Sequence, residues 1–178
     1  MKFSVRDMAL SALFAALIAV CSWISVPSAV PFTLQTFGVF MAAGLLGGKR
    51  GTVSVLIYIL LGAAGIPVFS GFKGGAGVLA GSTGGYIVGF LFTALIIWLF
   101  EAKARNRKYT LPISMAVGLL ACYAFGTAWF MFVYARTSGS VGLVTALTWC
   151  VFPFILPDAA KITLACFLIR RIKSVVRV

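Results

Sequence analysis

The chain alternates long apolar runs with short polar or basic segments. Several of the runs approach or exceed the length of about 20 residues that a helix needs to cross a hydrocarbon core, and one, at 52–64, is short. They cover residues 8–26, a stretch that begins at 33–37 and ends at 47–48, then 52–64, 85–100, 111–134 and 141–169. This pattern predicts an all-α membrane protein with six transmembrane helices, forming one domain over residues 1–178. The composition agrees, because 62% of the residues are hydrophobic and only 10% are charged.

Basic residues gather beside alternate apolar runs. The chain has 15 Lys and Arg against 3 Asp and Glu, and most of the basic residues lie in the N-terminal segment, the 49–50 and 103–108 loops and the C-terminal tail. Under the positive-inside rule this distribution predicts that both termini are cytoplasmic. The expected surroundings are membrane lipid and not nucleic acid, because the charges flank membrane spans. We therefore expect a multi-pass protein of the cell membrane.

The last apolar run contains an acid and a base, Asp158 and Lys161. A lone charge at the centre of a transmembrane helix costs about 2.5–3.5 kcal/mol or more. The three-residue spacing places both side chains on one helix face, where opposite charges offset each other's desolvation. Two interpretations follow. The pair forms the polar base of a chamber that takes a small, mostly apolar guest, or it is a structural ion pair.

Two prolines, Pro153 and Pro157, interrupt the same run. Proline suits the first turn of a helix, so we expect the final helix to begin near Pro157, after a bent or separate segment at 141–152. Residues 157–172 would span about 24 Å, which is less than a hydrocarbon core of roughly 30 Å. Asp158 would then lie in the first helical turn, below the outer surface, where the helix dipole favours an anion.

Residues 66–86 are rich in glycine but also carry large apolar side chains. Glycine allows tight turns and close approach to a ligand, while the aromatic residues favour burial. This composition indicates an outward loop that caps a chamber, with a re-entrant packing loop as the alternative. A phosphate-binding loop is not indicated, because Lys73 is followed by Gly74 and not by Ser or Thr.

Small residues recur at helical spacing in three of the runs. Ala12 and Ala16, with Ala15 and Ala19, allow another helix to approach the first run closely. The fourth run has Gly85 and Gly89, and the fifth run has Gly118, Cys122 and Gly126. We expect these stripes to be packing faces. At the end of the fourth run, Glu101 is expected to form a surface pair with Arg105.

The sequence supplies little enzymatic chemistry. It has no histidine, and its three acids are Asp7, Glu101 and Asp158, of which the first two are expected at the cytoplasmic face. This excludes His-based nucleophilic sites, His-ligated metals and paired carboxylates. The four scattered cysteines are expected to be buried hydrophobes. We therefore expect no catalytic residue, no metal and no bound cofactor. A proton-coupled exporter that uses one membrane-embedded acid is the rival function.

Three stretches together resemble the BioY family of biotin-binding S-components of energy-coupling factor (ECF) transporters. They are residues 31–37 (PFTLQTF), the glycine-rich run from Gly65 to Tyr86, and residues 153–161 (PFILPDAAK). One departure is Ser82, where the family pattern has proline, and the turn at residues 27–31 is short. Both departures bear on loop shape.

The resemblance implies a subunit that captures biotin from the outer side, with an S-component for another vitamin as a further alternative. It also implies a transmembrane coupling protein and two cytoplasmic ATPase subunits as partners, and only these subunits would hydrolyse ATP. In that family the small-residue face of the first helix meets the coupling protein. Here this face comprises Ala12, Ala16 and Ala19.

The resemblance also implies roles for individual residues. Asp158 is expected to accept from the N–H groups of the biotin ureido ring, and Lys161 to donate to its carbonyl. As an alternative, Lys161 or Lys73 holds the valerate carboxylate. The other implied binding residues are Phe69, Phe72 and Tyr86, which pack on the ligand, Gln35 and Thr33, which add hydrogen bonds, and Gly75 in the cover.

Overall fold

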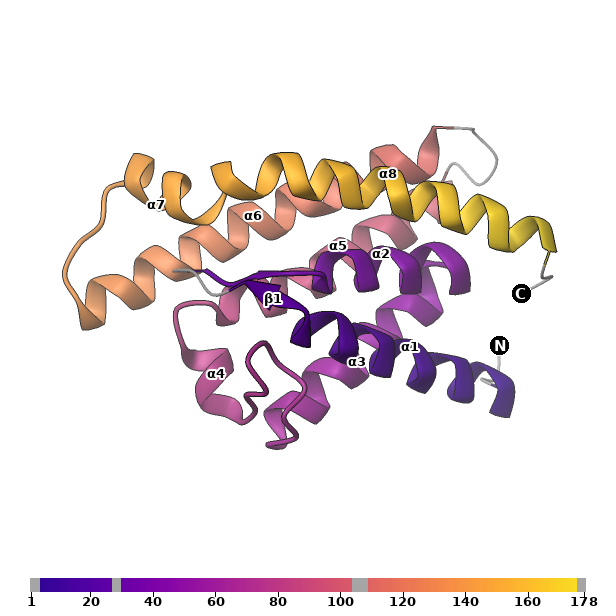
Figure 1. Cartoon of the computed structure of the whole chain (residues 1–178), viewed down its shortest axis with the longest axis horizontal. Coiled ribbons are helices and arrows are strands. Elements are labelled where there is room, and N and C mark those ends of the chain that lie inside the picture. Colours follow the sequence, from indigo (N-terminus) through magenta and orange to yellow (C-terminus); the bar gives the residue numbers. More distant parts are fainter. Residues whose placement is uncertain (1–3, 27–29, 104–108, 176–178) are drawn as a thin grey trace.

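The computed structural model describes residues 4–26, 30–103 and 109–175, and the fold is almost entirely helical. Figure 1 shows long helices lying side by side, with a short connection crossing between them. The elements are α1 (Val5–Trp23), β1 (Ser25–Val26), β2 (Phe32–Thr33), α2 (Gln35–Leu46), α3 (Gly48–Ala63), α4 (Ala76–Ala80), α5 (Gly84–Lys103), α6 (Thr110–Thr137), α7 (Leu143–Cys150) and α8 (Phe152–Val175).

Four of these helices, α1, α5, α6 and α8, are long and apolar enough to cross a membrane. This confirms the prediction of a helical membrane protein. The 12-residue helix α2 is apolar but short, and at 1.5 Å per residue it covers about 18 Å. It follows a small antiparallel ladder in which Ser25 pairs with Thr33 and Val26 with Phe32.

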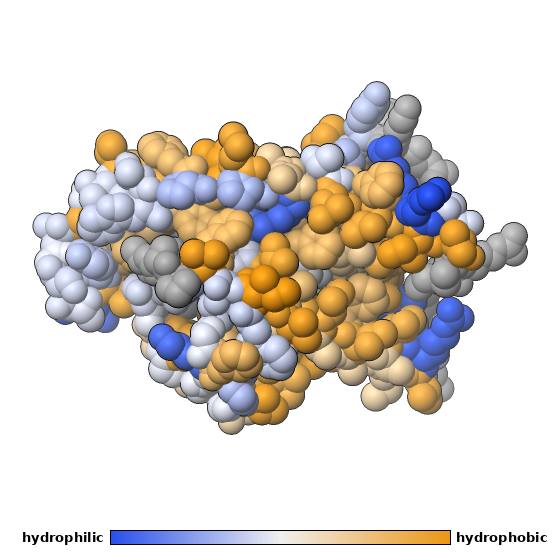
Figure 2. Space-filling model, viewed as in Figure 1, coloured by the Kyte–Doolittle hydropathy of each residue, from blue (hydrophilic) through white to orange (hydrophobic). Residues whose placement is uncertain are grey.

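The start of α1 and the start of α3 are joined by an ion pair. Ser4 caps α1 in a capping box with Asp7, which explains why the helix begins before the predicted residue 8. Asp7 also pairs with Arg50 of α3, with 3.2 Å between the charged atoms. Figure 1 places the beginning of α1 and the end of α8 at the same end of the molecule, and Figure 2 shows strongly hydrophilic side chains there beside largely hydrophobic helix surfaces.

A glycine turn connects α2 to α3 at this end. Gly47 has a φ of 84°, a left-handed conformation that favours glycine. The next backbone amide, of Gly48, donates to the Glu101 carboxylate at 2.6 Å. The acid therefore satisfies a free amide at the start of α3. The expected Glu101 pair with Arg105 involves a residue outside the described part of the chain.

Helices α5 and α6 pack through the predicted small-residue stripes. A Cβ atom on Gly89 would lie 2.7 Å from the Cys122 sulfur, and one on Gly126 would lie 2.2 Å from the Tyr86 ring. Both distances are too short for real atoms, so only glycine permits this approach. The predicted role of these stripes is confirmed, and the packing brings Tyr86 and Cys122 together next to the site described below.

The predicted start of the last helix was wrong. The helix α8 begins at Phe152 and contains Pro157, while α7 ends at Cys150. Pro153 occupies the first turn, as proline prefers, and Pro157 lies inside the helix, where it has no N–H to bond to residue 153. The 24 residues of α8 extend about 36 Å. Asp158 consequently lies within a continuous helix, and the charge of a helix end does not explain its burial.

Candidate functional site

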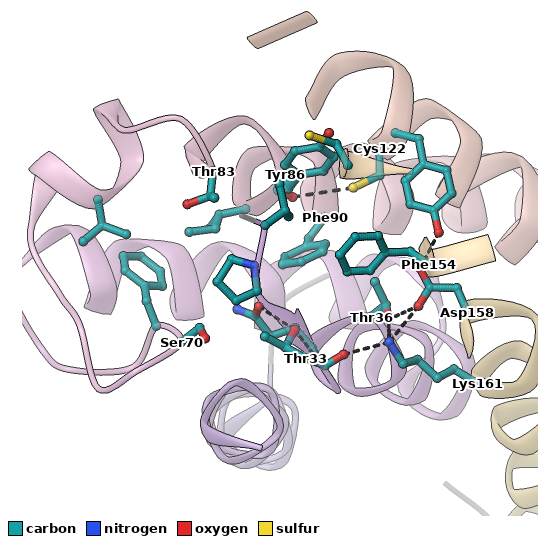
Figure 3. A pocket seen from close by; sticks show the side chains of 18 of the residues that line it. Thr33, Thr36, Ser70, Thr83, Tyr86, Phe90, Cys122, Phe154, Asp158 and Lys161 are labelled. Atoms are coloured by element: carbon teal, nitrogen blue, oxygen red, sulfur yellow. Dashed lines mark hydrogen bonds and ion pairs between the residues drawn. The ribbon is translucent and has the colours of Figure 1, made fainter. Parts of the chain in front are cut away.

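A cavity of about 120 Å³ lies between the glycine-rich segment, the β1–β2 connection and helices α5, α6 and α8. One water molecule needs only about 10–15 Å³ of such space, so side-chain packing leaves the cavity open. Figure 3 shows Asp158 and Lys161 at one end and Ser70 and Thr83 at the other. The lining residues used below are Thr33, Gln35, Thr36, Phe69, Ser70, Lys73, Thr83, Tyr86, Cys122, Tyr123, Asp158 and Lys161.

Asp158 and Lys161 are both buried and directly paired. The Lys161 ammonium lies 2.7 Å from the Asp158 carboxylate, and the two residues are 6% and 2% exposed. Lys161 also donates to the Thr33 carbonyl at 2.7 Å and lies 4.3 Å from the centre of the Phe32 ring. Such a cation–π contact strengthens when water is excluded. The structure thus places the charged pair on the inner face of α8, as the spacing predicted.

Two further polar residues complete this end of the cavity, and sequence reasoning missed both. The Thr36 hydroxyl donates to the Asp158 carboxylate at 3.0 Å and accepts from Lys161 at 3.2 Å. The Tyr123 hydroxyl donates to the other carboxylate oxygen at 2.5 Å. Both residues are next to residues that the sequence had singled out. Thr36 follows Gln35 in the first motif, and Tyr123 follows Cys122 of the small-residue stripe on α6.

Thr33 and Gln35 line the cavity, but their side chains are tied to each other. The Thr33 hydroxyl donates to the Gln35 side-chain oxygen at 2.8 Å, and the Gln35 side-chain nitrogen donates to the Tyr58 hydroxyl. These bonds lie at the start of α2, next to the Thr33 carbonyl that accepts from Lys161.

The glycine-rich segment forms one wall of the cavity. Phe69, Ser70, Lys73 and Thr83 all line it. The Phe69 ring is 1% exposed and rests edge-on against Tyr58, with ring centres 5.6 Å apart. Gly62 makes room for it, because a Cβ there would lie 2.0 Å from the ring.

Two of the predicted binding residues lie elsewhere. Phe72 is 65% exposed and stacks on Trp23, away from the cavity. Gly75 does not line the cavity either; its amide donates to the Gly62 carbonyl at 2.7 Å, and its φ of 99° suits the turn before α4. Both residues belong to the segment without lining the chamber.

Tyr86 lines the cavity from the start of α5 and is 8% exposed. Its hydroxyl is 2.9 Å from the Thr127 hydroxyl on α6. This bond fixes the ring across Gly126 and satisfies the polar atom of a largely buried tyrosine. The cavity wall at this point is therefore mostly apolar.

The predicted partner face of α1 is only partly available. Ala12 and Ala16 are exposed, but Ala19 is 5% exposed and belongs to the protein core. Ala19 is therefore excluded from a surface for another protein. Its neighbour Ala15 is buried as well, since it faces the interior with Ile18.

Within the described residues, no three side chains among His, Cys, Asp and Glu are grouped as a metal site would require. The polar side chains that line the cavity instead carry hydroxyls, one amide, two thiols, one carboxylate and two ammonium groups. This set is suited to hydrogen bonding with a small organic molecule.

An open cavity beside a buried charged pair, in a helical membrane protein, is typical of a protein that binds a small molecule. Comparison with known proteins identifies the family within this class. The chain belongs to the BioY family, whose family model matches residues 1–178. This confirms the resemblance carried by the three motifs.

Relatives match nearly the whole chain. The biotin transporter BioY of Thermotoga maritima is 42% identical over 173 residues, covering 96% of this chain and 97% of that protein. The biotin transporter BioY of Rhizobium etli is 34% identical over 95% of this chain and 94% of its own. A crystal structure of the S-component for biotin from an ECF-type ABC transporter superposes with a TM-score of 0.84, at 31% identity, over 96% of this chain and 92% of that chain.

Proposed function

We propose that this protein is the biotin-binding membrane subunit, or S-component, of an ECF-type vitamin uptake transporter. The observation that carries the proposal is the buried pair of Asp158 and Lys161 at one end of an open, largely apolar cavity. Family membership supports biotin as the guest, and it favours a vitamin carrier over the proton-coupled exporter. Biotin fits the chemistry, because its ureido ring has two N–H donors and one carbonyl acceptor, while its remaining atoms are mostly apolar.

The ligand would lie with its ureido ring at the charged pair and its carboxylate toward the glycine-rich segment. Lys161 has already committed its three N–H groups to Thr33, Thr36 and Asp158. A ligand carboxylate could take an N–H from Lys161 only by displacing one of these three partners. Lys73 lies at the cavity wall with Ser70, on an exposed part of the chain. This contrast supports Lys73, and not Lys161, as the partner of the valerate carboxylate.

The proposed topology has six spans with both termini in the cytoplasm. The end of the molecule with the beginning of α1 and the end of α8 carries Arg50, Lys103 and Arg171 among other basic residues, which supports a cytoplasmic position for it. The glycine-rich segment lies toward the other end (Figure 1), so the cavity would open to the outside. Biotin would be captured there before a coupling protein and two ATPase subunits, the only ATP-consuming partners, act on the complex.

Titration of the purified protein in detergent with biotin tests the proposal. We expect saturable binding of biotin, and none of thiamine, riboflavin or the lipophilic cation tetraphenylphosphonium. Binding of the cation with proton release, and no binding of biotin, would contradict the proposal and support the exporter. Tight binding of another vitamin in place of biotin would overturn the ligand assignment alone.

A further inference from the structure

The Asp158 carboxylate is nearly saturated by donors from the protein itself. One oxygen, Oδ1, accepts from Lys161 at 2.7 Å and from Thr36 at 3.0 Å. The other, Oδ2, accepts from the Tyr123 hydroxyl. A carboxylate has about four acceptor positions in all. Three are filled, so a single position remains, and it belongs to Oδ2.

Lys161 is committed in the same way. An ammonium group has three N–H donors, and Lys161 directs them at Asp158 Oδ1, the Thr33 carbonyl and the Thr36 hydroxyl. The bond to Thr36 is the longest, at 3.2 Å against 2.7 Å for the other two. A ligand carbonyl that takes an N–H from Lys161 would therefore displace Thr36 first, and Thr36 would keep its own bond to Asp158.

We propose that Tyr123 and Thr36 are positioning residues that make the Asp158–Lys161 pair present one acceptor and one exchangeable donor to the cavity. This inference rests on the proposed function. One acceptor beside one donor matches a single N–H and the adjacent carbonyl of a cyclic urea. Asp158 would then accept from only one of the two ureido N–H groups, whereas the family resemblance led us to expect bonds from both.

The arrangement is fixed because its members come from separate elements. Thr36 belongs to α2, Tyr123 to α6, and the charged pair to α8, while the Phe32 ring on β2 lies against the ammonium. The carboxylate cannot rotate without breaking bonds to two other helices. Binding groups held in this way lose little conformational freedom when a ligand arrives.

Two biotin derivatives, each methylated on one of the ureido nitrogens, test the inference. For the unmodified protein, methylation of the nitrogen that faces Oδ2 should lower the affinity about ten- to a hundredfold, as expected for the loss of a charge-assisted hydrogen bond. Methylation of the other nitrogen should cost much less. The ratio of the two dissociation constants is the quantity measured.

The variant Tyr123→Phe opens a second acceptor position on Oδ2, so this ratio should fall several-fold toward one. Steric fit alone would not change the ratio, because the ring is retained. Tyr134→Phe, on the same helix but with its ring against Phe130 and Trp149, is the matched control and should keep the ratio. Thermal unfolding in detergent checks that each variant is folded.

Thr36→Val and Thr36→Ser give a second measurement if Tyr123→Phe does not fold. The valine variant loses both bonds to the pair and should bind biotin about tenfold more weakly, while the serine variant retains the hydroxyl and should restore binding. If the parent protein does not bind biotin at all, the proposed function fails. If it binds biotin but the ratio starts near one, or is unchanged in Tyr123→Phe, the positioning role is wrong.

Discussion

The ring of Phe72 stacks on the indole ring of Trp23, with ring centres 5.1 Å apart and planes 24° from parallel. Trp23 also donates its indole N–H to the Pro67 carbonyl at 3.0 Å. The neighbouring Ser22 hydroxyl donates to the Val68 carbonyl. The last turn of α1 therefore holds the same segment that supplies Phe69, Ser70 and Lys73 to the cavity wall.

This stack predicts that Phe72 controls how often the cover opens. The variant Phe72→Ala loses an aromatic pair of about 0.5–1.5 kcal/mol, so biotin should dissociate several-fold faster. The rate can be measured by chasing labelled biotin with an excess of unlabelled ligand. Phe167→Ala, which removes another exposed ring from α8, should leave the rate unchanged. Equal dissociation from both variants would show that the stack does not restrain the cover.

The charged pair predicts an unusual pattern of stability. Asp158→Asn or Lys161→Met alone leaves one buried charge without its partner, which costs about 3–5 kcal/mol. The double variant leaves neither charge and should be more stable than each single variant. Thermal unfolding of the ligand-free protein gives the comparison, independently of what the cavity binds.

The surface pair of Asp7 and Arg50 is the control for this experiment. Its side chains are 25% and 33% exposed, and exposed ion pairs contribute about 0–1 kcal/mol. Arg50→Gln removes this pair and leaves the capping box of α1 intact, so it should change the unfolding temperature little. A single Asp158→Asn variant as stable as Arg50→Gln would mean that the buried pair contributes no more than the surface pair.

The contact between Gly126 and Tyr86 predicts that one methyl group damages both stability and binding. A Cβ at this position meets the Tyr86 ring at 2.2 Å, and an overpacked core loses about 1–3 kcal/mol. In Gly126→Ala the Tyr86 ring must shift from its place in the cavity wall, so biotin affinity should fall as well. Gly77→Ala, where the added Cβ meets nothing within 4 Å, should retain both.

The sequence was most informative where a residue contradicted its surroundings. Asp158 and Lys161 stand out in an apolar run, and their spacing fixes a common helix face, so their meeting could be predicted. The positions of Gly89 and Gly126 were also informative, because helical periodicity tells which residues share a face. These inferences need only the spacing of residues along a helix and the knowledge that the helix lies in a membrane.

Inference from sequence was weakest where no periodicity applies. Phe72 and Phe69 look alike in a glycine-rich loop, yet one is 65% exposed and the other 1%, and only the path of the loop separates them. The start of α8 was misplaced because proline at residue 157 is tolerated inside this helix. Thr36 and Tyr123 are common residue types, and their role depends on contacts between helices far apart in sequence.

The placement of Lys73 predicts which ligands it affects. If it holds the valerate carboxylate, Lys73→Gln should weaken biotin binding about tenfold, since a bond between charged groups contributes about 1.5–3 kcal/mol when well formed and less when exposed. Binding of the neutral biotin amide should hardly change. Lys173→Gln, an exposed lysine at the other end of the chain, serves as the control. An equal loss for biotin and its amide would place the carboxylate elsewhere.

The exposed face of α1 predicts a loss of assembly without a loss of binding. Ala12 and Ala16 are exposed on α1, and small residues let helices approach closely in membranes. Ala16→Trp should therefore prevent co-purification with the coupling protein and ATPases and abolish ATP-dependent uptake, while biotin binding to the isolated subunit stays within a few-fold. Leu13→Trp, a change at a large side chain already 63% exposed, should assemble normally. If Ala16→Trp assembles as well as Leu13→Trp, the coupling protein docks on another face.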